Sequence, residues 1–256
     1  MTSPEAPRYE TIGVGYARRR QPDPRIAAQI HGHLGDPGER PHVLNVGAGA
    51  GSYEPDDRRV TAVEPSPRMI AQRPPTVTRD VVRAVGGALP FPDGTFAAAT
   101  ALLTVHHWPD PFAGLAEVRR VTTGPVVVFT FDYAVHADQW LVTDYFPEML
   151  AFDTDLPTPT ELAAALGGGT VEVVPIPVDC VDGFMHAWWR RPEAYLEPEV
   201  RAAISGLARL GEDATAPGVE RLRADLASGA WAERHADLLD RTELDAGYRL
   251  VISPGR

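Results

Sequence analysis

The sequence predicts an α/β fold built on a mostly parallel sheet, and three stretches carry that prediction. Residues 43–46 form a short apolar segment that runs directly into a glycine-rich turn at residues 47–51. Residues 60–63 form a second apolar segment, which ends at Glu64. Residues 96–103 are apolar nearly throughout, as expected of a central parallel strand covered by helices on both faces.

The glycine turn has the spacing Gly47-x-Gly49-x-Gly51. Glycine has no Cβ, so such a turn lets the backbone approach a bound nucleotide closely. Glu64, at the end of the next strand, is placed to accept hydrogen bonds from both hydroxyls of a ribose. This layout serves dinucleotide enzymes and S-adenosylmethionine (SAM) enzymes. A dinucleotide site needs a glycine or alanine at the position of Ser52, so the spacing favours SAM.

Four motifs in the first half occur in the order found in class I SAM-dependent methyltransferases, and the chain resembles their bacterial small-molecule branch, the type 11-like proteins. The resemblance runs from about residue 16 to residue 135. The L-P-F-x-D-x-x-F element within it has no counterpart in a dinucleotide fingerprint. The motifs lie at residues 43–53, 63–66, 89–96 and 106–110.

The resemblance implies SAM as cofactor and a Rossmann-like seven-stranded sheet of order 3-2-1-4-5-7-6, with the last strand antiparallel. The chain departs from the family pattern at two positions: Asn45, where Asp or Glu is usual, and Gly87, where Asp is usual. Together, the turn and the resemblance predict these cofactor-binding residues: Tyr16, Arg20, Asn45, Gly47, Ala48, Gly49, Gly51, Glu64, Pro65, Met69, Gly87, Ala88, Leu89, Thr104 and His106.

Polar side chains follow the fourth and fifth predicted strands. His106 and His107 come after residues 96–103, and Asp132 and His136 come after the strand at residues 126–131. Ligands of open α/β sheets bind beyond the carboxyl ends of the strands, and histidine takes up a proton near neutral pH. We therefore predict His106, His107 and His186 as catalytic residues and Asp132 and His136 as substrate contacts. The alternatives are a histidine that only packs and an aspartate that stabilises a loop.

Aspartate–proline pairs predict two helix starts, because Asp is a favourable N-cap and Pro suits the first helical position. The pairs lie at residues 23–24 and 110–111. The side chains expected to face the core are Ile26, Ile30 and Leu34 in the first helix, and Phe112, Leu115 and Val118 in the second.

A long segment at residues 184–246 separates the last two predicted strands, residues 171–178 and 247–252. A parallel sixth strand ends at the carboxyl edge, so this segment must emerge above the active site. Prolines at 198 and 217 predict the starts of two amphipathic helices, and a third is expected around Trp231. We predict a helical lid at 184–246, inserted into an α/β domain made of residues 1–183 and 247–256.

The start of this segment is rich in aromatic residues. Aromatic side chains together with one polar group suit an apolar small-molecule site. We predict that Phe184, His186 and Trp188 contact substrate, whereas Trp189 docks the insertion on the sheet. The alternative is that both tryptophans only dock the insertion.

Composition excludes several classes. The net charge of -11 argues against a nucleic acid or an anionic membrane as partner, and Cys180 is the only cysteine. No apolar run reaches the roughly 18 residues of a membrane span, and the N-terminus does not resemble a signal peptide. We expect a cytoplasmic protein without a catalytic metal, because His31 and His33 lack nearby carboxylate ligands. A monomer and a homodimer both fit.

The predicted function is SAM-dependent methylation of a small molecule in a biosynthetic pathway. The enzyme would place a nitrogen, oxygen or carbon nucleophile in line with the sulfonium methyl group, and the product would be S-adenosylhomocysteine (SAH). One alternative is a protein of the same fold that catalyses another reaction, such as a cyclisation, without releasing SAH. Another is a binding protein without catalytic activity.

Overall fold

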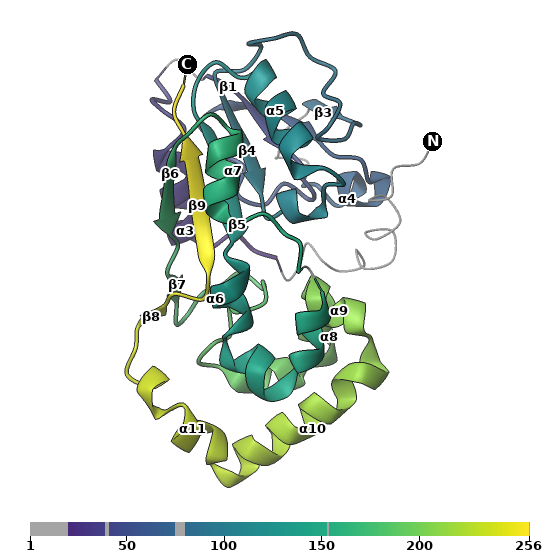
Figure 1. Cartoon of the computed structure of the whole chain (residues 1–256), viewed down its shortest axis with the longest axis vertical. Helices are drawn as coiled ribbons and strands as arrows, with labels where there is room; N and C mark the ends of the chain where they lie inside the picture. Colours follow the sequence, from purple (N-terminus) through teal and green to yellow (C-terminus); the bar gives the residue numbers. More distant parts are fainter. Residues whose placement is uncertain (1–19, 39–40, 75–79, 153, 256) are drawn as a thin grey trace.

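The protein consists of an α/β layer and a helical layer beyond one edge of its sheet (Figure 1). The computed structural model describes residues 20–38, 41–74, 80–152 and 154–255. The seven-stranded sheet has the order β3-β2-β1-β4-β5-β9-β6, in which β9 alone runs antiparallel to its neighbours, as predicted. The strands are β1 (His42–Val46), β2 (Arg59–Val63), β3 (Asp80–Val82), β4 (Ala98–Leu102), β5 (Val126–Phe131), β6 (Thr170–Val173) and β9 (Tyr248–Ser253).

Side-chain caps begin the helices of the α/β layer. Asp23 accepts a hydrogen bond from the Arg25 amide, and Ser66 and Asp110 cap the next two helices in the same way. A proline stands at the start of each helix. The helices are α3 (Pro24–Gly32), α4 (Pro67–Ala71), α5 (Pro111–Val121) and α7 (Pro159–Ala165).

Two clusters of buried apolar side chains cover the two faces of the sheet. Ile26 and Ile30 of α3 join one cluster, together with Val127 and Phe129 of β5. The intervening β5 residues belong to the other cluster, with side chains of α5 and α7. Successive strand residues point to opposite faces, so both faces of these central strands are covered.

Several local expectations were wrong. Phe112 is 48% exposed, because the buried stripe of α5 passes through Leu115 and Val118 instead. The largely apolar residues 81–85 predict a third strand, whereas the observed β3 ends at Val82. The expected sixth strand is divided, because β6 ends before Pro175 and the following β7 (Ile176–Pro177) pairs with β8 (Glu243–Leu244).

The helical layer is built from two separate segments of the chain. One segment follows β5, and the other is the insertion between β7 and β8. Contacts of α10 with η2 and of α9 with η3 join the two segments. The elements are α6 (Tyr133–Ala137), η2 (Leu141–Tyr145), η3 (Pro147–Ala151), η4 (Pro192–Leu196), α8 (Pro198–Ala203), α9 (Ser205–Leu210), α10 (Glu212–Ser228), α11 (Ala230–Arg234) and η5 (Ala236–Leu238).

The predicted helices of the insertion form with different boundaries. The helix that begins at Pro198 is interrupted at Ile204, whose extended backbone separates α8 from α9. Pro217 lies inside α10 instead of starting it. Gly229 ends α10 in the left-handed conformation, which glycine adopts without steric strain.

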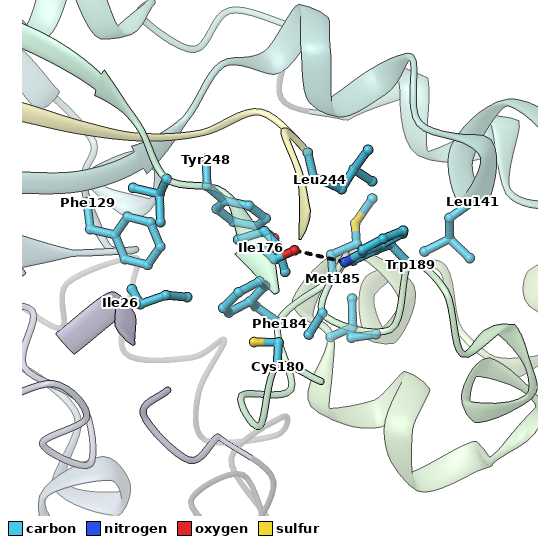
Figure 2. Packing of buried hydrophobic residues seen from close by; sticks show 14 of the residues in the cluster. Ile26, Phe129, Leu141, Ile176, Cys180, Phe184, Met185, Trp189, Leu244 and Tyr248 are labelled. Atoms are coloured by element: carbon cyan, nitrogen blue, oxygen red, sulfur yellow. Dashed lines mark hydrogen bonds between the residues drawn. The ribbon is translucent and has the colours of Figure 1, made fainter. Parts of the chain in front are cut away.

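Trp189 anchors the insertion to the α/β layer. Its indole N–H donates to the Ile176 carbonyl at 3.0 Å (Figure 2). Its own carbonyl accepts from the Trp140 indole at 3.0 Å. Trp189 therefore packs in the core, as the docking prediction expects, but its hydrogen bonds are to β7 and to the helical layer and not to the seven-stranded sheet. Its cluster runs from α3 to α11, so the two layers share one core, and the predicted domain boundaries stay a prediction. In the described ranges, no helix is both long and apolar enough to cross a membrane.

Candidate active site

The glycine turn packs directly on the segment that follows β4. Gly47 has φ of +70°, and a Cβ at this position would lie 2.0 Å from the Thr104 hydroxyl oxygen. The Gly47 and Ala48 amides both donate to the Val63 carbonyl, at 2.8 and 3.0 Å. Glycine is therefore required at position 47 both by its backbone conformation and by the close contact with Thr104.

Glu64 lies at the end of β2 and is 5% exposed. One carboxylate oxygen accepts from the Gly49 amide and the other from the Ser66 amide, each at 2.8 Å. Burial raises the pKa of Glu64, whereas these two hydrogen bonds and nearby Arg73 lower it. Each carboxylate oxygen has a second lone pair, so Glu64 can still accept the two ribose hydroxyls.

Asn45 belongs to a buried network below the turn. Its amide nitrogen donates to Glu54 at 2.9 Å, and its amide oxygen accepts from the Thr100 hydroxyl at 3.1 Å. Arg73 forms a bidentate ion pair with Glu54, at 2.6 and 2.7 Å, and donates to the Gly49 carbonyl at 3.2 Å. This network holds the turn in place from beneath. Asn45 carries no charge, and the acid that pairs with Arg73 is Glu54.

A cavity opens between the glycine turn, Glu64 and the segment after β4. Nine of the predicted cofactor residues line it: Arg20, Asn45, Gly47, Ala48, Gly49, Glu64, Pro65, Met69 and Thr104. Sequence reasoning missed other residues of the lining, including Tyr53, Ala84, Gly86, Leu103 and Trp108, whereas His107, which also lines it, was predicted as a catalytic residue. We call this space the cofactor cavity. Tyr16 lies outside the described residues.

Five predicted cofactor residues do not line this cavity: Gly51, Gly87, Ala88, Leu89 and His106. Leu89 is held elsewhere, because its amide donates to Glu117 and its carbonyl accepts from Arg120. Ala84 and Gly86, which follow the end of β3 at Val82, line the cavity instead of residues 87–89.

A second cavity of about 200 Å³ lies between the carboxyl edge of the sheet and the helical layer. Most of its lining is aliphatic or aromatic, and none of its described lining residues is Asp or Glu. We call it the acceptor cavity. Its residues are Arg20, Leu103, His106, His107, Phe131, Tyr133, His136, Ala137, Val142, Met149, Leu150, Phe152, Phe184, Met185, Ile204, Ser205, Gly206, Arg209 and Tyr248.

The two cavities adjoin each other. Arg20, Leu103 and His107 line both of them. A ligand in the cofactor cavity and a ligand in the acceptor cavity would therefore meet at these three side chains. His107, and not His106, is the histidine at this boundary.

The predicted histidines form a row of contacting rings. The His106 ring centre lies 4.0 Å from that of His107 and 5.1 Å from Phe131, which stacks on His136 at 4.6 Å. His186 contacts His136 at 4.2 Å but does not line the acceptor cavity.

Burial governs the protonation of the two inner histidines. It lowers the pKa of His136 to about 4, and together with the neighbouring His136 it holds the pKa of His186 well below its usual value. Both rings are therefore neutral at neutral pH. His186 was predicted to be catalytic, but it is 2% exposed and does not reach the acceptor cavity. Its ring packs against His136 instead.

The structure also places two predicted substrate contacts away from the acceptor cavity. The Asp132 carboxylate caps α6 by accepting from the Ala134 amide, which is the loop-stabilising alternative. Trp188 lies in a different groove, where the Arg191 guanidinium stacks on its ring at 4.3 Å. Phe184 and His136 do line the acceptor cavity. Among the described residues, no three His, Cys, Asp or Glu side chains are grouped as metal ligands.

Comparison with known proteins adds to this geometry. The family described as methyltransferase domain matches residues 44–130. A solved structure from Anabaena variabilis, assigned as a methyltransferase from an antibiotic biosynthesis pathway, is 32% identical, with a TM-score of 0.84. The match covers 92% of this chain and 98% of that protein. The chain belongs to the SAM-dependent methyltransferase family. Curated proteins give no significant match by sequence.

A more distant structure shares the fold of this methyltransferase. Geranyl diphosphate C-methyltransferase from Streptomyces coelicolor, solved with Mg²⁺, geranyl diphosphate and SAH, has a TM-score of 0.53 at 15% identity. The match covers 91% of this chain and 79% of that protein.

Membership of the family makes SAM the cofactor of this methyltransferase. The residues present fit SAM, because the glycine turn opens the backbone toward a cavity that has the Glu64 carboxylate at one side. Met69 and Leu103 offer apolar surface in the same cavity.

Proposed function

We propose that the protein transfers the methyl group of SAM to a small, largely apolar acceptor, in a biosynthetic pathway. The observation that carries this proposal is the sharing of Arg20, Leu103 and His107 by the cofactor cavity and the acceptor cavity. Two adjoining chambers can hold a sulfonium methyl group and a nucleophile in contact while excluding water. Positioning of this kind supplies much of the rate of a methyl transfer.

The acceptor cavity favours an apolar substrate with few polar groups. Phe131, Phe184 and Met185 offer apolar surface, and His106, His107 and His136 supply the polar groups nearest the sheet. A neutral histidine can accept a hydrogen bond from a nucleophilic hydroxyl or amine. The likeness to the Anabaena protein supports a biosynthetic role.

The test combines a titration with a screen. Calorimetry with SAM establishes the loaded enzyme, and a panel of aromatic and terpenoid alcohols, amines and enols is then screened for release of SAH. We expect release with at least one acceptor. SAM binding without SAH release from any member of the panel would count against methyl transfer to apolar acceptors and favour another reaction on the same fold.

Ala137→Phe tests where the acceptor binds. Ala137 lines the acceptor cavity and is absent from the lining of the cofactor cavity. A phenyl group at this position fills acceptor space only. The variant should bind SAM with unchanged affinity and lose acceptor-dependent SAH release. Unchanged SAH release would place the acceptor elsewhere.

A further inference from the structure

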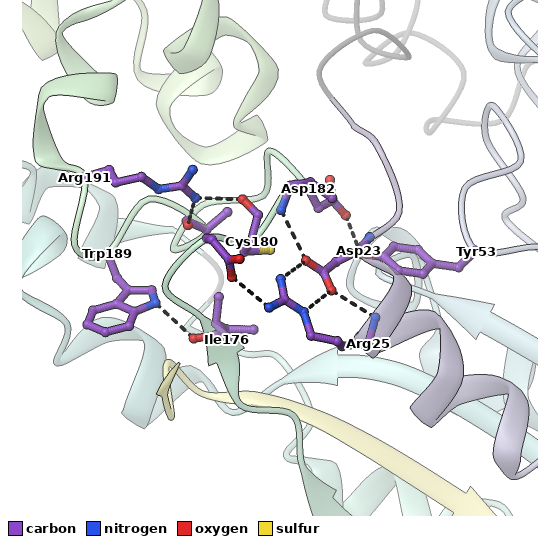
Figure 3. A network of polar contacts seen from close by, with 11 residues as sticks. Asp23, Arg25, Tyr53, Ile176, Cys180, Asp182, Trp189 and Arg191 are labelled. Atoms are coloured by element: carbon purple, nitrogen blue, oxygen red, sulfur yellow. Dashed lines mark hydrogen bonds and ion pairs between the residues drawn. The ribbon is translucent and has the colours of Figure 1, made fainter. Parts of the chain in front are cut away.

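The Asp182 carboxylate collects hydrogen bonds from three parts of the chain. Asp182 lies between β7 and the helical layer and is fully buried. It accepts from Arg20 Nε at 2.7 Å, from the Tyr53 hydroxyl at 2.7 Å and from the Gly183 amide at 2.6 Å. Figure 3 shows the Tyr53 and Asp182 side chains side by side at the start of α3.

A carboxylate without contact with water must be compensated by charge and by hydrogen bonds. Asp182 receives both, from the Arg20 guanidinium and from two further donors. Arg20 and Tyr53 both line the cofactor cavity, although Asp182 does not. One acid at the base of the insertion therefore holds two side chains of the cofactor site.

Arg20 is fixed at more than one point. Its carbonyl accepts from the Ser52 hydroxyl at 3.3 Å, and its guanidinium carbon lies 5.9 Å from the centre of the Phe184 ring. Asp182 binds the guanidinium through Nε, which determines the direction in which the terminal nitrogens point. The planar guanidinium fork matches a carboxylate geometrically, so its direction matters for binding one.

Tyr53 is the second residue of the cofactor cavity that Asp182 binds. It lies two residues after Gly51, the last glycine of the turn, has φ of +64° and is 4% exposed. Its hydroxyl donates to Asp182 and accepts from the Asp23 amide at 3.3 Å. The end of the turn is thereby tied both to α3 and to the base of the insertion.

We propose that Asp182 is a positioning residue that orients Arg20 toward the carboxylate of the amino acid group of SAM. This inference rests on the proposed function and deepens it, because it assigns recognition of one part of the cofactor to a residue of the second half of the chain. Arg20 borders the acceptor cavity as well, so the same ion pair sets one wall of that cavity.

The experiment compares two ligands that differ by the amino acid group. Calorimetry on the full chain measures the affinities for SAH and for 5′-methylthioadenosine. The second ligand retains the nucleoside and lacks the carboxylate. Asp182→Asn should weaken SAH binding about tenfold, the loss typical of one charge-assisted hydrogen bond. The affinity for methylthioadenosine should stay within about twofold of the wild-type value. Arg20→Gln should act in the same way, and the double variant should add little, because the two residues act as one unit.

Asp23→Asn is the matched control. Asp23 is also a fully buried carboxylate of this network, but its side chain contacts Arg25 and the Val181 amide, not Arg20 (Figure 3). The control should keep the wild-type ratio of the two affinities. Arg20→Lys provides a second variant if Asp182→Asn does not fold, since lysine leaves Asp182 with a cation but lacks the fork.

Two results would overturn the role of Asp182. One is an equal loss of affinity for both ligands in Asp182→Asn, which would indicate that Asp182 is only structural. The other is unchanged affinity for SAH in the same variant. Neither result bears on methyl transfer itself, which is judged by SAH release from wild-type protein. Conversely, absence of release leaves the comparison of the two ligands intact.

Discussion

The cofactor edge of the sheet and the helical layer are held together in different ways. At the cofactor edge, main-chain groups do most of the work: Gly47 and Ala48 donate to Val63, and Glu64 accepts from two amides. In the helical layer the helices are mostly short, and large buried aromatic side chains connect them. Those aromatics are Trp140, Tyr145, Trp189, Tyr195 and Trp231.

The difference indicates where each region is sensitive to mutation. The cofactor edge should respond most to changes that affect the backbone or its hydrogen bonds, with ligand affinity as the main readout. The helical layer should respond most to loss of aromatic volume, with stability as the readout. Four predictions test this contrast, from the largest expected effect to the smallest.

Trp189→Ala should destabilise the protein by about 3–5 kcal/mol, the range found for truncation of a buried large aromatic side chain. Trp189 is 1% exposed, and its indole N–H is bonded to the Ile176 carbonyl. Urea unfolding measures the change. Phe112→Ala is the control, since Phe112 is largely exposed and its loss should stay within about 0.5 kcal/mol. If Trp189→Ala lowers the free energy of unfolding by less than about 1 kcal/mol, the large aromatic side chains are not what stabilises the helical layer.

Gly47→Ala should lower SAM affinity by more than about 100-fold, equivalent to about 2.7 kcal/mol. The new Cβ would overlap the Thr104 hydroxyl at 2.0 Å, so the turn must move. Calorimetry measures the affinity. Gly87→Ala is the control, because a Cβ there has no described neighbour within 4 Å and the affinity should change less than threefold. Equal effects of the two substitutions would show that the close contact at Gly47 is unimportant.

Glu64→Gln should weaken SAH and methylthioadenosine together, each by about tenfold. Both ligands contain the ribose that Glu64 is expected to bind, and the glutamine NH₂ would face one of the amides that the carboxylate now accepts from. This parallel loss is the opposite of the selective loss expected for Asp182→Asn. A selective loss of SAH would mean that Glu64 does not bind the ribose.

Stability should fall as the pH is lowered from about 6.5 to 4. Burial depresses the pKa of His136 to about 4 and that of His186 well below normal, so the unfolded chain binds protons over this range while the folded protein does not. The slope should approach about 1.4 kcal/mol per pH unit for each such group. Urea unfolding at several pH values gives the slope, and His136→Phe should make it shallower. An unaltered slope would assign the acid sensitivity to other groups.

The sequence predicted the cofactor edge well, because its features are local. The glycine turn, Glu64 and the proline-started helices each follow from a few neighbouring residues, and the sheet order followed from the family resemblance. Three of the five predicted cofactor residues outside the cavity follow β3, and for these the difference is one of register. Residues 87–89 were predicted to bind the cofactor because the third strand was expected over residues 81–85, whereas β3 ends at Val82 and Ala84 and Gly86 line the cavity.

The acceptor cavity was predicted less completely, because side chains from two distant segments form it. Met149, Leu150 and Phe152 line it, although their local sequence resembles any apolar loop. Trp188 and Trp189 are adjacent in sequence, and only the burial of Trp189 agrees with the prediction. Trp188 lies in a groove with residues of η4, α8 and α10, and the local sequence does not indicate that these elements come together around it. The Arg20–Asp182 pair also joins residues far apart in the chain, so no local signal announces it.

The small β7–β8 sheet has a consequence for how this enzyme can be recombined with its relatives. The insertion begins after β7 and ends before β8, so this one pair of strands brings its two ends together. Its inner surface nevertheless packs on η2 and η3, which belong to the segment after β5. A chimaera that exchanges only the residues between β7 and β8 would pair mismatched surfaces. A transferable specificity unit must therefore carry residues 133–151 along with the insertion.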